Sequence, residues 1–337
     1  MAQPIVILSD RHRRSYMVIE ALYCAAFVRL GVPVLTEVTP PDAEGRALLA
    51  ARHAGRIVLQ NTLGEGFVPL PGCRNVAMPL HEWSLYPRPW AERLNAFDEV
   101  WVASRHLLEV MQRSGVTVPV RELPPPLDCD PVPPKDDCVA RVPFSFYFCG
   151  EPHFRKGHHL LLAAFLEAFP EPGVARLTIK TSGGCDWQAP RSDIRIVAEE
   201  WGREQCLAAY REHDCFVTAS LGEGLGLPLA EAILAGLPVA ANFWGGHRSI
   251  VAPGGFFEIP HREVDQPFAS RPEFYTPGQC CALSDVPAVA TTLRTVVSST
   301  AEMRSAQARV AREHLLATYG AAACLPLLDA ALRQLAR

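Results

Sequence analysis

The sequence lacks several patterns that would assign it to a common protein class. It has eleven cysteines but no CxxC pair and no Cys/His set at zinc-ligand spacing. This excludes a zinc ribbon and favours free thiols in a reducing compartment over a disulfide framework. Charge of one sign is not in large excess, with a formal net charge of −4, so nothing argues for a nucleic-acid partner. We expect a cytoplasmic protein.

Targeting and membrane signals are also missing. Residues 4–10 form a short apolar run without a basic leader, which predicts a first strand rather than a signal peptide. No run is expected to reach the about 20 residues of a membrane span. The first run is not followed by GxGxxG, which disfavours a nicotinamide-dependent dehydrogenase.

Strand and helix patterns alternate along the chain. A helix is predicted from about residue 15 to 30 between two strands, and proline concentrates in residues 123–134, predicting a stiff linker. Because 337 residues with 49% hydrophobic content suffice for two cores, we predict an α/β protein with two Rossmann-like domains facing a cleft. The expected strands are residues 5–8, 32–38, 56–59, 75–78, 99–102, 144–149, 176–180, 194–197, 215–218 and 238–241.

A helix start follows a glycine-rich loop in residues 220–241. Pro228 suits the first helical position, and Gly236 with Pro238 is a stop signal. We therefore predict a short helix over residues 229–235, with Glu231 in its first turn. The glycines of the loop let backbone N–H groups approach a ligand, and the helix start attracts phosphate.

The same segment carries two carboxylates, Glu223 and Glu231. A phosphate would repel them, so we expect both to accept hydrogen bonds from sugar hydroxyls nearby. Together with the backbone of Gly224, Leu225 and Gly226, they predict a site for a phosphorylated sugar.

Two cations, Arg155 and Lys156, lie in a loop between a predicted strand and a helix over residues 160–169. The loop would place them at the carboxyl end of a sheet, where open α/β folds bind ligands. Such a pair is often only solvated. Its position about seventy residues before the paired glutamates, with strands and helices between, favours an anionic ligand.

The spacing of a Glu, seven residues and a Glu, preceded by residues 214–220 (DCFVTAS), resembles the donor-site signature of retaining glycosyltransferases of family 4. The resemblance implies a GT-B fold in which Glu231 holds the ribose hydroxyls of a sugar nucleotide and Glu223 contacts the transferred sugar. It also implies that Arg155 and Lys156 grip the donor diphosphate and neutralise charge as it leaves.

The resemblance extends over most of the chain. Residues 78–83 (MPLHEW), Trp90, residues 97–104 (FDEVWVAS) and residues 275–285 are similar to a family 4 subgroup with an acidic motif before a DEVWV-S strand. It implies an acceptor domain at residues 1–125 and a donor domain at 126–319, with a final helix at about 320–337 packing back on the first. Residues 9–15 replace the Gly-Gly pair of many members, which leaves acceptor contacts open.

Further candidates are weaker. His81 and Glu82 follow a strand and are candidates for contacting the sugar or the acceptor hydroxyl, although His81 is equally read as a structural histidine. Gly245 and Gly246 are interpreted either as amide donors to the sugar or as a turn. The remaining candidates are Lys180 and Glu200 as donor contacts, and Arg11 and Arg14 as acceptor contacts or a local basic cluster.

The sequence thus predicts a retaining, metal-independent transferase that uses a UDP or GDP sugar as donor and needs no cofactor. The acceptor is left open among small metabolites, glycans, lipids and proteins, as is peripheral membrane contact. Two alternatives stay open: a sugar-nucleotide epimerase or hydrolase on the same fold, and a non-enzymatic sugar-nucleotide-binding protein.

Overall fold

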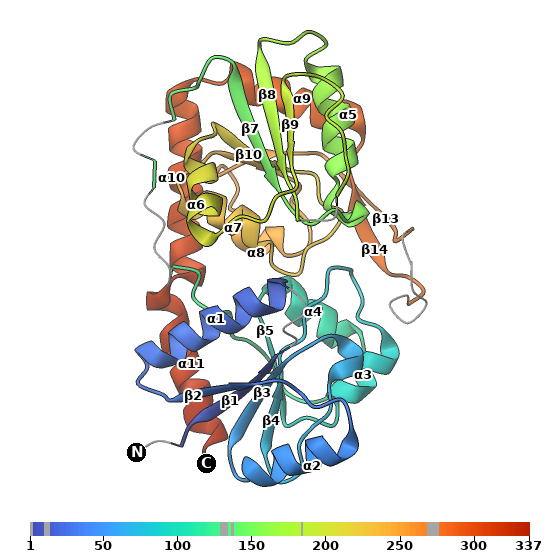
Figure 1. Ribbon diagram of the computed structural model, residues 1–337, viewed down its shortest axis with the longest axis vertical. Helices are drawn as coiled ribbons and strands as arrows, with labels where there is room; N and C mark the ends of the chain where they lie inside the picture. The colour runs from blue at the N-terminus through green and yellow to red at the C-terminus, as the bar shows by residue number, and fades with distance from the viewer. Residues whose placement is uncertain (1–2, 10–13, 129–133, 136–137, 183–184, 268–275) are drawn as a thin grey trace. The chain divides into compact units, whose positions relative to one another are not determined.

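The computed structural model describes all residues except 1–2, 10–13, 129–133, 136–137, 183–184 and 268–275. The chain divides into two compact units (Figure 1). The first comprises residues 1–129, 269–279 and 316–337, and the second comprises residues 130–268 and 280–315. Each contains a six-stranded parallel sheet, which confirms the predicted α/β fold class.

The first unit has the strand order β2-β1-β3-β4-β5-β6. Strand β1 (Ile5–Ser9), second in this order, is buried along its whole length, because it is apolar and pairs on both sides, with Val6 opposite Leu35 and Val58. Helix α4 begins after Ser104, whose side chain accepts a hydrogen bond from the Leu107 N–H. The other elements are α1 (Arg14–Arg29), β2 (Val34–Glu37), α2 (Ala43–Arg52), β3 (Ile57–Asn61), η1 (Gly64–Gly66), β4 (Arg74–Ala77), α3 (Arg88–Leu94), β5 (Glu99–Val102), α4 (Arg105–Arg113) and β6 (Val120–Glu122).

The second unit has the strand order β12-β11-β10-β7-β8-β9. Strand β7 (Phe144–Cys149) carries Phe144, Phe146 and Phe148 on one face, where they pack in the core with Phe165 of α5. This alternation explains the aromatic strand seen in the sequence. The other elements are η2 (Phe154–Lys156), α5 (His158–Ala168), β8 (Ala175–Lys180), β9 (Ile194–Val197), α6 (Arg203–Arg211), β10 (Cys215–Thr218), α7 (Leu227–Leu234), β11 (Val239–Ala241), α8 (His247–Ile250), β12 (Phe257–Glu258) and α9 (Val286–Ser298).

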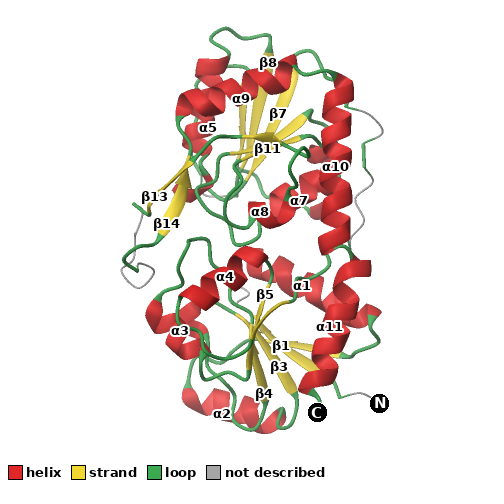
Figure 2. Cartoon of the chain, turned by 180° about the vertical axis from the view of Figure 1, so that it is seen from behind, coloured by secondary structure: helices red, strands yellow, loops and turns green. Residues whose placement is uncertain are grey.

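A two-stranded antiparallel ribbon, β13 (Arg262–Asp265) and β14 (Cys280–Leu283), also belongs to the second unit, as Figure 2 shows. This ribbon was not predicted from the sequence. Three of the four residues of β13 are charged, so no apolar alternation marks it as a strand.

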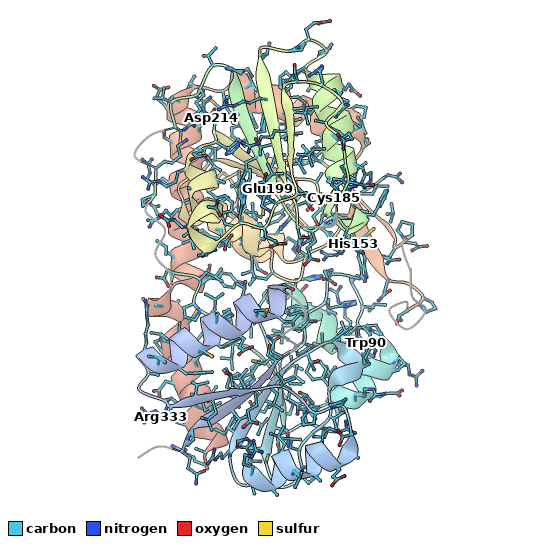
Figure 3. The ribbon with its side chains drawn as sticks, viewed as in Figure 1. Trp90, His153, Cys185, Glu199, Asp214 and Arg333 are labelled. Carbon is cyan, nitrogen blue, oxygen red and sulfur yellow. The ribbon has the colours of Figure 1, made fainter. Side chains whose placement is uncertain are left out.

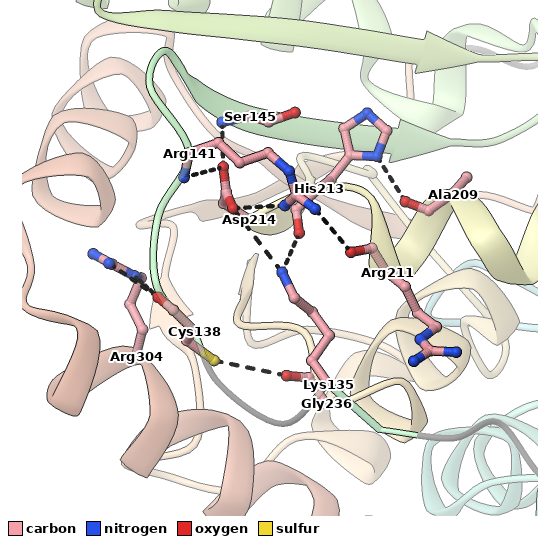
Figure 4. A network of polar contacts seen from close by, with 10 residues as sticks. All are labelled: Lys135, Cys138, Arg141, Ser145, Ala209, Arg211, His213, Asp214, Gly236 and Arg304. Carbon is pink, nitrogen blue, oxygen red and sulfur yellow. Dashed lines mark hydrogen bonds and ion pairs between the residues drawn. The ribbon is translucent and has the colours of Figure 1, made fainter.

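A polar network holds the amino ends of β7 and β10 together (Figure 4). The buried Asp214 carboxylate accepts hydrogen bonds from Arg141 Nη1 at 2.9 Å and from the Ser145 N–H at 2.9 Å. Lys135 Nζ lies 4.0 Å from the same carboxylate. A buried carboxylate is costly unless it is paired, so these contacts allow Asp214 to lie inside the unit.

The last two helices connect the units along the chain. Helix α10 (Ala301–Tyr319) begins in the second unit, where Arg304 Nη2 donates to the Cys138 carbonyl at 3.1 Å. Helix α11 (Ala321–Leu335) belongs to the first unit, and its Ala321 N–H donates to Asp128 at 2.7 Å. The acceptor and donor roles given to the two domains stay predictions.

By length and composition, Ala301–Leu335 meets the test for a membrane-spanning helix, with a window of mean hydropathy 1.6. The expectation that no run reaches this length is therefore wrong. It failed because α10 and α11 are separated only by Gly320, so their apolar residues fall into one window. Buried helices of soluble proteins pass the same test, and 39% of this window is buried.

Part of the predicted linker is instead packed core. Residues 123–127 are buried in the first unit. The Tyr23 hydroxyl donates to the Leu123 carbonyl at 2.6 Å, and the Leu127 N–H donates to the Tyr319 carbonyl at 2.8 Å. Proline is compatible with this packing because the prolines at 124–126 have no N–H to satisfy, while Leu123 and Leu127 on either side donate theirs to the Val102 and Tyr319 carbonyls. The units divide at residue 129, later than expected.

Candidate functional site

The candidate site lies at the carboxyl ends of β7 and β10 in the second unit. These strands are parallel neighbours, with Tyr147 opposite Phe216, so the loops that follow them emerge at one edge of the sheet. Figure 3 shows His153, Cys185 and Glu199, on loops that follow β7, β8 and β9, at the other end of the sheet from Asp214. Figure 4 therefore shows the amino end of the sheet, and the candidate site lies at the carboxyl end.

The structure brings the predicted cations and Glu223 together. Lys156 Nζ lies 2.7 Å from Glu223 Oε1, and Arg155 Nη1 lies 3.3 Å from Glu223 Oε2. Arg155 Nη1 also donates to the Gly222 carbonyl at 2.6 Å, and Ser220 Oγ donates to Glu223 Oε1 at 2.8 Å. Two cations and one carboxylate leave one net positive charge in this three-residue cluster.

Electrostatics keep Glu223 ionised. Burial alone would raise the pKa of its carboxyl group, but the nearby charge of Lys156, then of Arg155, outweighs burial and holds the pKa at about 2. Side-chain exposure is 12% for Glu223, 15% for Lys156 and 13% for Arg155. The cluster is thus shielded from bulk water, where ion pairs are weaker.

Glycines let three loops pack backbone to backbone. A Cβ on Gly157 (φ +70°), which follows Lys156, would lie 2.0 Å from the Ala219 carbonyl oxygen. A Cβ on Gly246 would lie 2.6 Å from the backbone of Gly224. The Gly246 N–H donates to the Glu223 carbonyl at 2.7 Å. This amide is therefore hydrogen-bonded within the loops, which agrees with the interpretation of Gly245 and Gly246 as a turn.

Asn242 and His247 were missed by sequence reasoning. Asn242 Nδ2 donates to the Ser220 carbonyl at 2.6 Å, and its Oδ1 lies 3.2 Å from His247 Nδ1. Burial lowers the pKa of His247 to about 4, against the opposing effect of Glu223. A neutral imidazole therefore lies beside the cluster. The Gly-Gly pair before His247 was the one signal that pointed to this loop.

Glu231 lies on α7, which begins at Leu227 after Gly226 takes a left-handed φ of +96°. The helix therefore begins one residue before Pro228, the position predicted to be its first. Glu231 lies in the second turn and not the first, because the left-handed glycine, and not Pro228, determines the start. Its carboxylate contacts Arg203 Nη1 through Oε1 and accepts a 2.9 Å hydrogen bond from Tyr210 through Oε2. Leu225, in the preceding loop, is buried.

Lys180 and Glu200 lie near the carboxyl ends of β8 and β9. Lys180 is 4% exposed, and its Nζ donates to the Thr181 carbonyl and, at 2.8 Å, to the Glu199 carbonyl. The same ammonium lies 5.2 Å from the centre of the Trp201 ring. Lys180 thus connects the two loops, while Glu200 is exposed.

Of the first-unit candidates, the structure describes His81, Glu82 and the position of Arg14 in its helix. His81 is buried, with Nε2 2.7 Å from the Leu85 carbonyl oxygen and its ring edge-on to Tyr86 at 5.2 Å. Glu82 beside it is half-buried. Arg11 lies outside the described residues, and Arg14 is the first residue of α1. Their roles stay predictions.

Across the residues that the structure describes, no group of three or more His, Cys, Asp or Glu side chains is placed to hold a metal ion. The charged cluster of Arg155, Lys156 and Glu223 instead holds two cations and one carboxylate. This set can bind an anion directly.

Comparison with known proteins places the site within a matched segment. Residues 143–270 match the family model described as "Glycosyl transferases group 1". The segment contains both cations and both glutamates, and no curated protein sequence matches the chain.

Solved structures share the fold at low identity. HepE from Anabaena in complex with UDP-glucose is 14% identical with a TM-score of 0.73, covering 98% of this chain and 99% of that one. Sucrose-phosphate synthase from Thermosynechococcus elongatus is 16% identical with a TM-score of 0.72, covering 99% of each chain. An E. coli structure described as trehalose-6-phosphate bound with UDP-2-fluoro glucose is 11% identical with a TM-score of 0.67, covering 98% and 99%. The chain thus shares its fold with GT-B proteins over nearly its whole length.

Proposed function

We propose that this protein is a retaining glycosyltransferase that moves a sugar from a nucleoside diphosphate donor, of UDP or GDP type, to an acceptor hydroxyl. The observation that carries the proposal is the convergence of Arg155 and Lys156 on buried Glu223 at the carboxyl edge of the sheet. The remaining positive charge suits a diphosphate. The group 1 match of residues 143–270 and the UDP-sugars bound by the structural neighbours support it.

In this proposal the diphosphate contacts Arg155 and Lys156, which stabilise the charge that develops as the bond to the sugar breaks. Glu223 orients the transferred sugar, and Glu231 accepts hydrogen bonds from the ribose hydroxyls beside the backbone of residues 224–226. The acceptor attacks from the face that the diphosphate leaves, so the anomeric configuration is retained. We further propose that the reaction takes place in the cytoplasm and persists after treatment with a metal chelator.

Ligand-induced thermal stabilisation tests the donor site. The panel comprises UDP, GDP, ADP and their glucose or mannose conjugates. A ligand at about 100 times its dissociation constant should add about 2.7 kcal/mol of stability. We expect stabilisation by one base class, lost in Glu231→Ala. No shift with any nucleotide would contradict the donor site.

Product analysis tests the reaction. Lys156→Ala should slow transfer by about 10²-fold or more, whereas Arg176→Ala, which removes an exposed cation from β8 of the same unit, should leave transfer unchanged. NMR of the product should show the anomeric configuration of the donor. Free sugar or an epimerised donor without acceptor would instead support the hydrolase or epimerase, and binding without turnover would support a binding protein.

A further inference from the structure

The carboxylate of Glu231 is held by a neighbouring helix. Tyr210 donates its hydroxyl to Glu231 Oε2 at 2.9 Å, and Arg203 Nη1 contacts Oε1. Both partners come from α6, whereas Glu231 lies on α7. The direction in which the carboxylate points is therefore determined by α6 as well as by its own helix.

Tyr210 is the rigid partner of the two. It is 1% exposed and packs edge-on against Tyr147, with ring centres 5.3 Å apart, and at a tilt against Phe216, with ring centres 6.0 Å apart. Burial, and then the charge of Glu231, raise the pKa of Tyr210 well above its ordinary value. The phenol therefore stays protonated and stays a donor. Arg203, with a side chain 47% exposed, is the solvent-exposed partner.

The hydrogen-bonding capacity of Glu231 is only half used by these partners. A carboxylate offers about four lone-pair sites, two on each oxygen. Tyr210 and Arg203 occupy one site on each oxygen, which leaves one open acceptor site on each. The side chain is 20% exposed, so a ligand can reach them. Two adjacent acceptor sites at a fixed angle match two neighbouring hydroxyl groups, as in a ribose.

We propose that Tyr210 is a positioning residue that acts through Glu231 to select ribonucleotides over 2′-deoxyribonucleotides, with Arg203 as a secondary partner. The inference rests on the proposed role of Glu231 as the ribose contact. A site built to pair with a hydroxyl rejects an analogue that lacks it, because a buried polar group is then left unpaired. Without the phenol, the carboxylate can turn and find another partner, so the penalty for the missing hydroxyl falls.

Isothermal titration with UDP and 2′-deoxy-UDP, and in parallel with GDP and 2′-deoxy-GDP, tests the inference. The unaltered protein should prefer the ribonucleotide by at least about tenfold. Tyr210→Phe should weaken ribonucleotide binding by about tenfold and reduce the preference to threefold or less. Tyr147→Phe is the matched control, since this tyrosine is also buried and packs against Tyr210, but no hydrogen bond joins its hydroxyl to Glu231 in the described part of the chain. It should leave the preference unchanged.

Arg203→Gln is a second variant that tests the same inference if Tyr210→Phe does not fold. Its exposed position should leave thermal stability unchanged, and the ribonucleotide preference should fall in the same direction. Lower thermal stability of Tyr210→Phe with an unaltered preference would show a purely structural residue and overturn the inference.

Glu231→Gln separates the inference from the proposed function. If it abolishes the preference while Tyr210→Phe and Arg203→Gln keep it, positioning is overturned and Glu231 remains the ribose contact. If Glu231→Gln keeps the preference for ribonucleotides, both the positioning role of Tyr210 and the ribose contact of Glu231 are overturned. Transfer by the Lys156 variants would still test the transferase proposal.

Discussion

Lys156 Nζ lies 2.7 Å from Glu223 Oε1, although the two residues are 67 positions apart in the chain. Their pairing joins the loop after β7 to the loop after β10 and places a carboxylate where an anionic ligand would otherwise meet two unopposed cations. Glu223 therefore reduces the charge available to a diphosphate while it fixes the positions of both cations.

Glu223→Gln should consequently bind UDP or GDP severalfold more tightly and transfer sugar at least about 10²-fold more slowly. Binding improves because the amide no longer opposes the phosphate charge, whereas the sugar loses its partner. Calorimetry at low and high salt measures the first effect, since the added attraction is screened by salt. Glu258→Gln, at an exposed position on β12, is the control. Unchanged or weaker nucleotide affinity would contradict this role.

Acid should destabilise the protein between about pH 6.5 and 4. The pKa of His247 and of His213 is lowered to about 4, mainly by burial, while an unfolded histidine titrates at about 6.5. As the pH falls through this window the unfolded chain takes up protons first, so the free energy of unfolding falls.

His247→Asn tests this linkage and keeps a donor toward Asn242. Urea unfolding at pH 7 and pH 5 should show a smaller loss of stability than in the unaltered protein, by up to about 2 kcal/mol. An identical loss of stability in both proteins would contradict this linkage. It would mean that His247 in the folded protein is already charged, or is as exposed as in the unfolded chain.

Asn242→Ala should destabilise the glycine loops. Asn242 is 1% exposed and contacts both the Ser220 carbonyl and His247. Its removal leaves these buried groups unpaired, at a cost of about 2–4 kcal/mol. Chemical denaturation measures the loss, and nucleotide affinity should fall with it because Ser220 also contacts Glu223. Asn95→Ala, at a half-buried position in the first unit, should have a smaller effect.

The main elements could be predicted because their patterns are local. The ranges of β5, β7, β9, β10 and α11 agree with the structure, since each is an apolar run bounded by turn residues. Short strands such as β6 and β12 were missed, because two or three residues carry no periodicity.

The site could be predicted only in part, for a similar reason. Parallel topology implies that the loops carrying Arg155 and Glu223 meet at one edge of the sheet. Nothing in the spacing reveals that Tyr210 lies beside Glu231 or that Asn242 contacts Ser220, because these contacts depend on how helices and loops pack in three dimensions. Glu231 was assigned to the first turn of the helix, because the left-handed conformation at Gly226, which starts the helix one residue before Pro228, is not visible in the sequence.

Asp214→Ala separates folding from binding, because Asp214 lies at the end of the sheet opposite the site. Removing its carboxylate leaves the charges of Arg141 and Lys135 without their partner and should lower the free energy of unfolding by about 3–5 kcal/mol. Asp329→Ala breaks an exposed pair with Arg333 and should cost less than about 1 kcal/mol. At a temperature where both variants are folded, each should bind nucleotide like the unaltered protein. A loss of affinity in folded Asp214→Ala would mean that the amino end of the sheet is coupled to the loops after β7 and β10, and the site would then extend beyond the residues assigned to it.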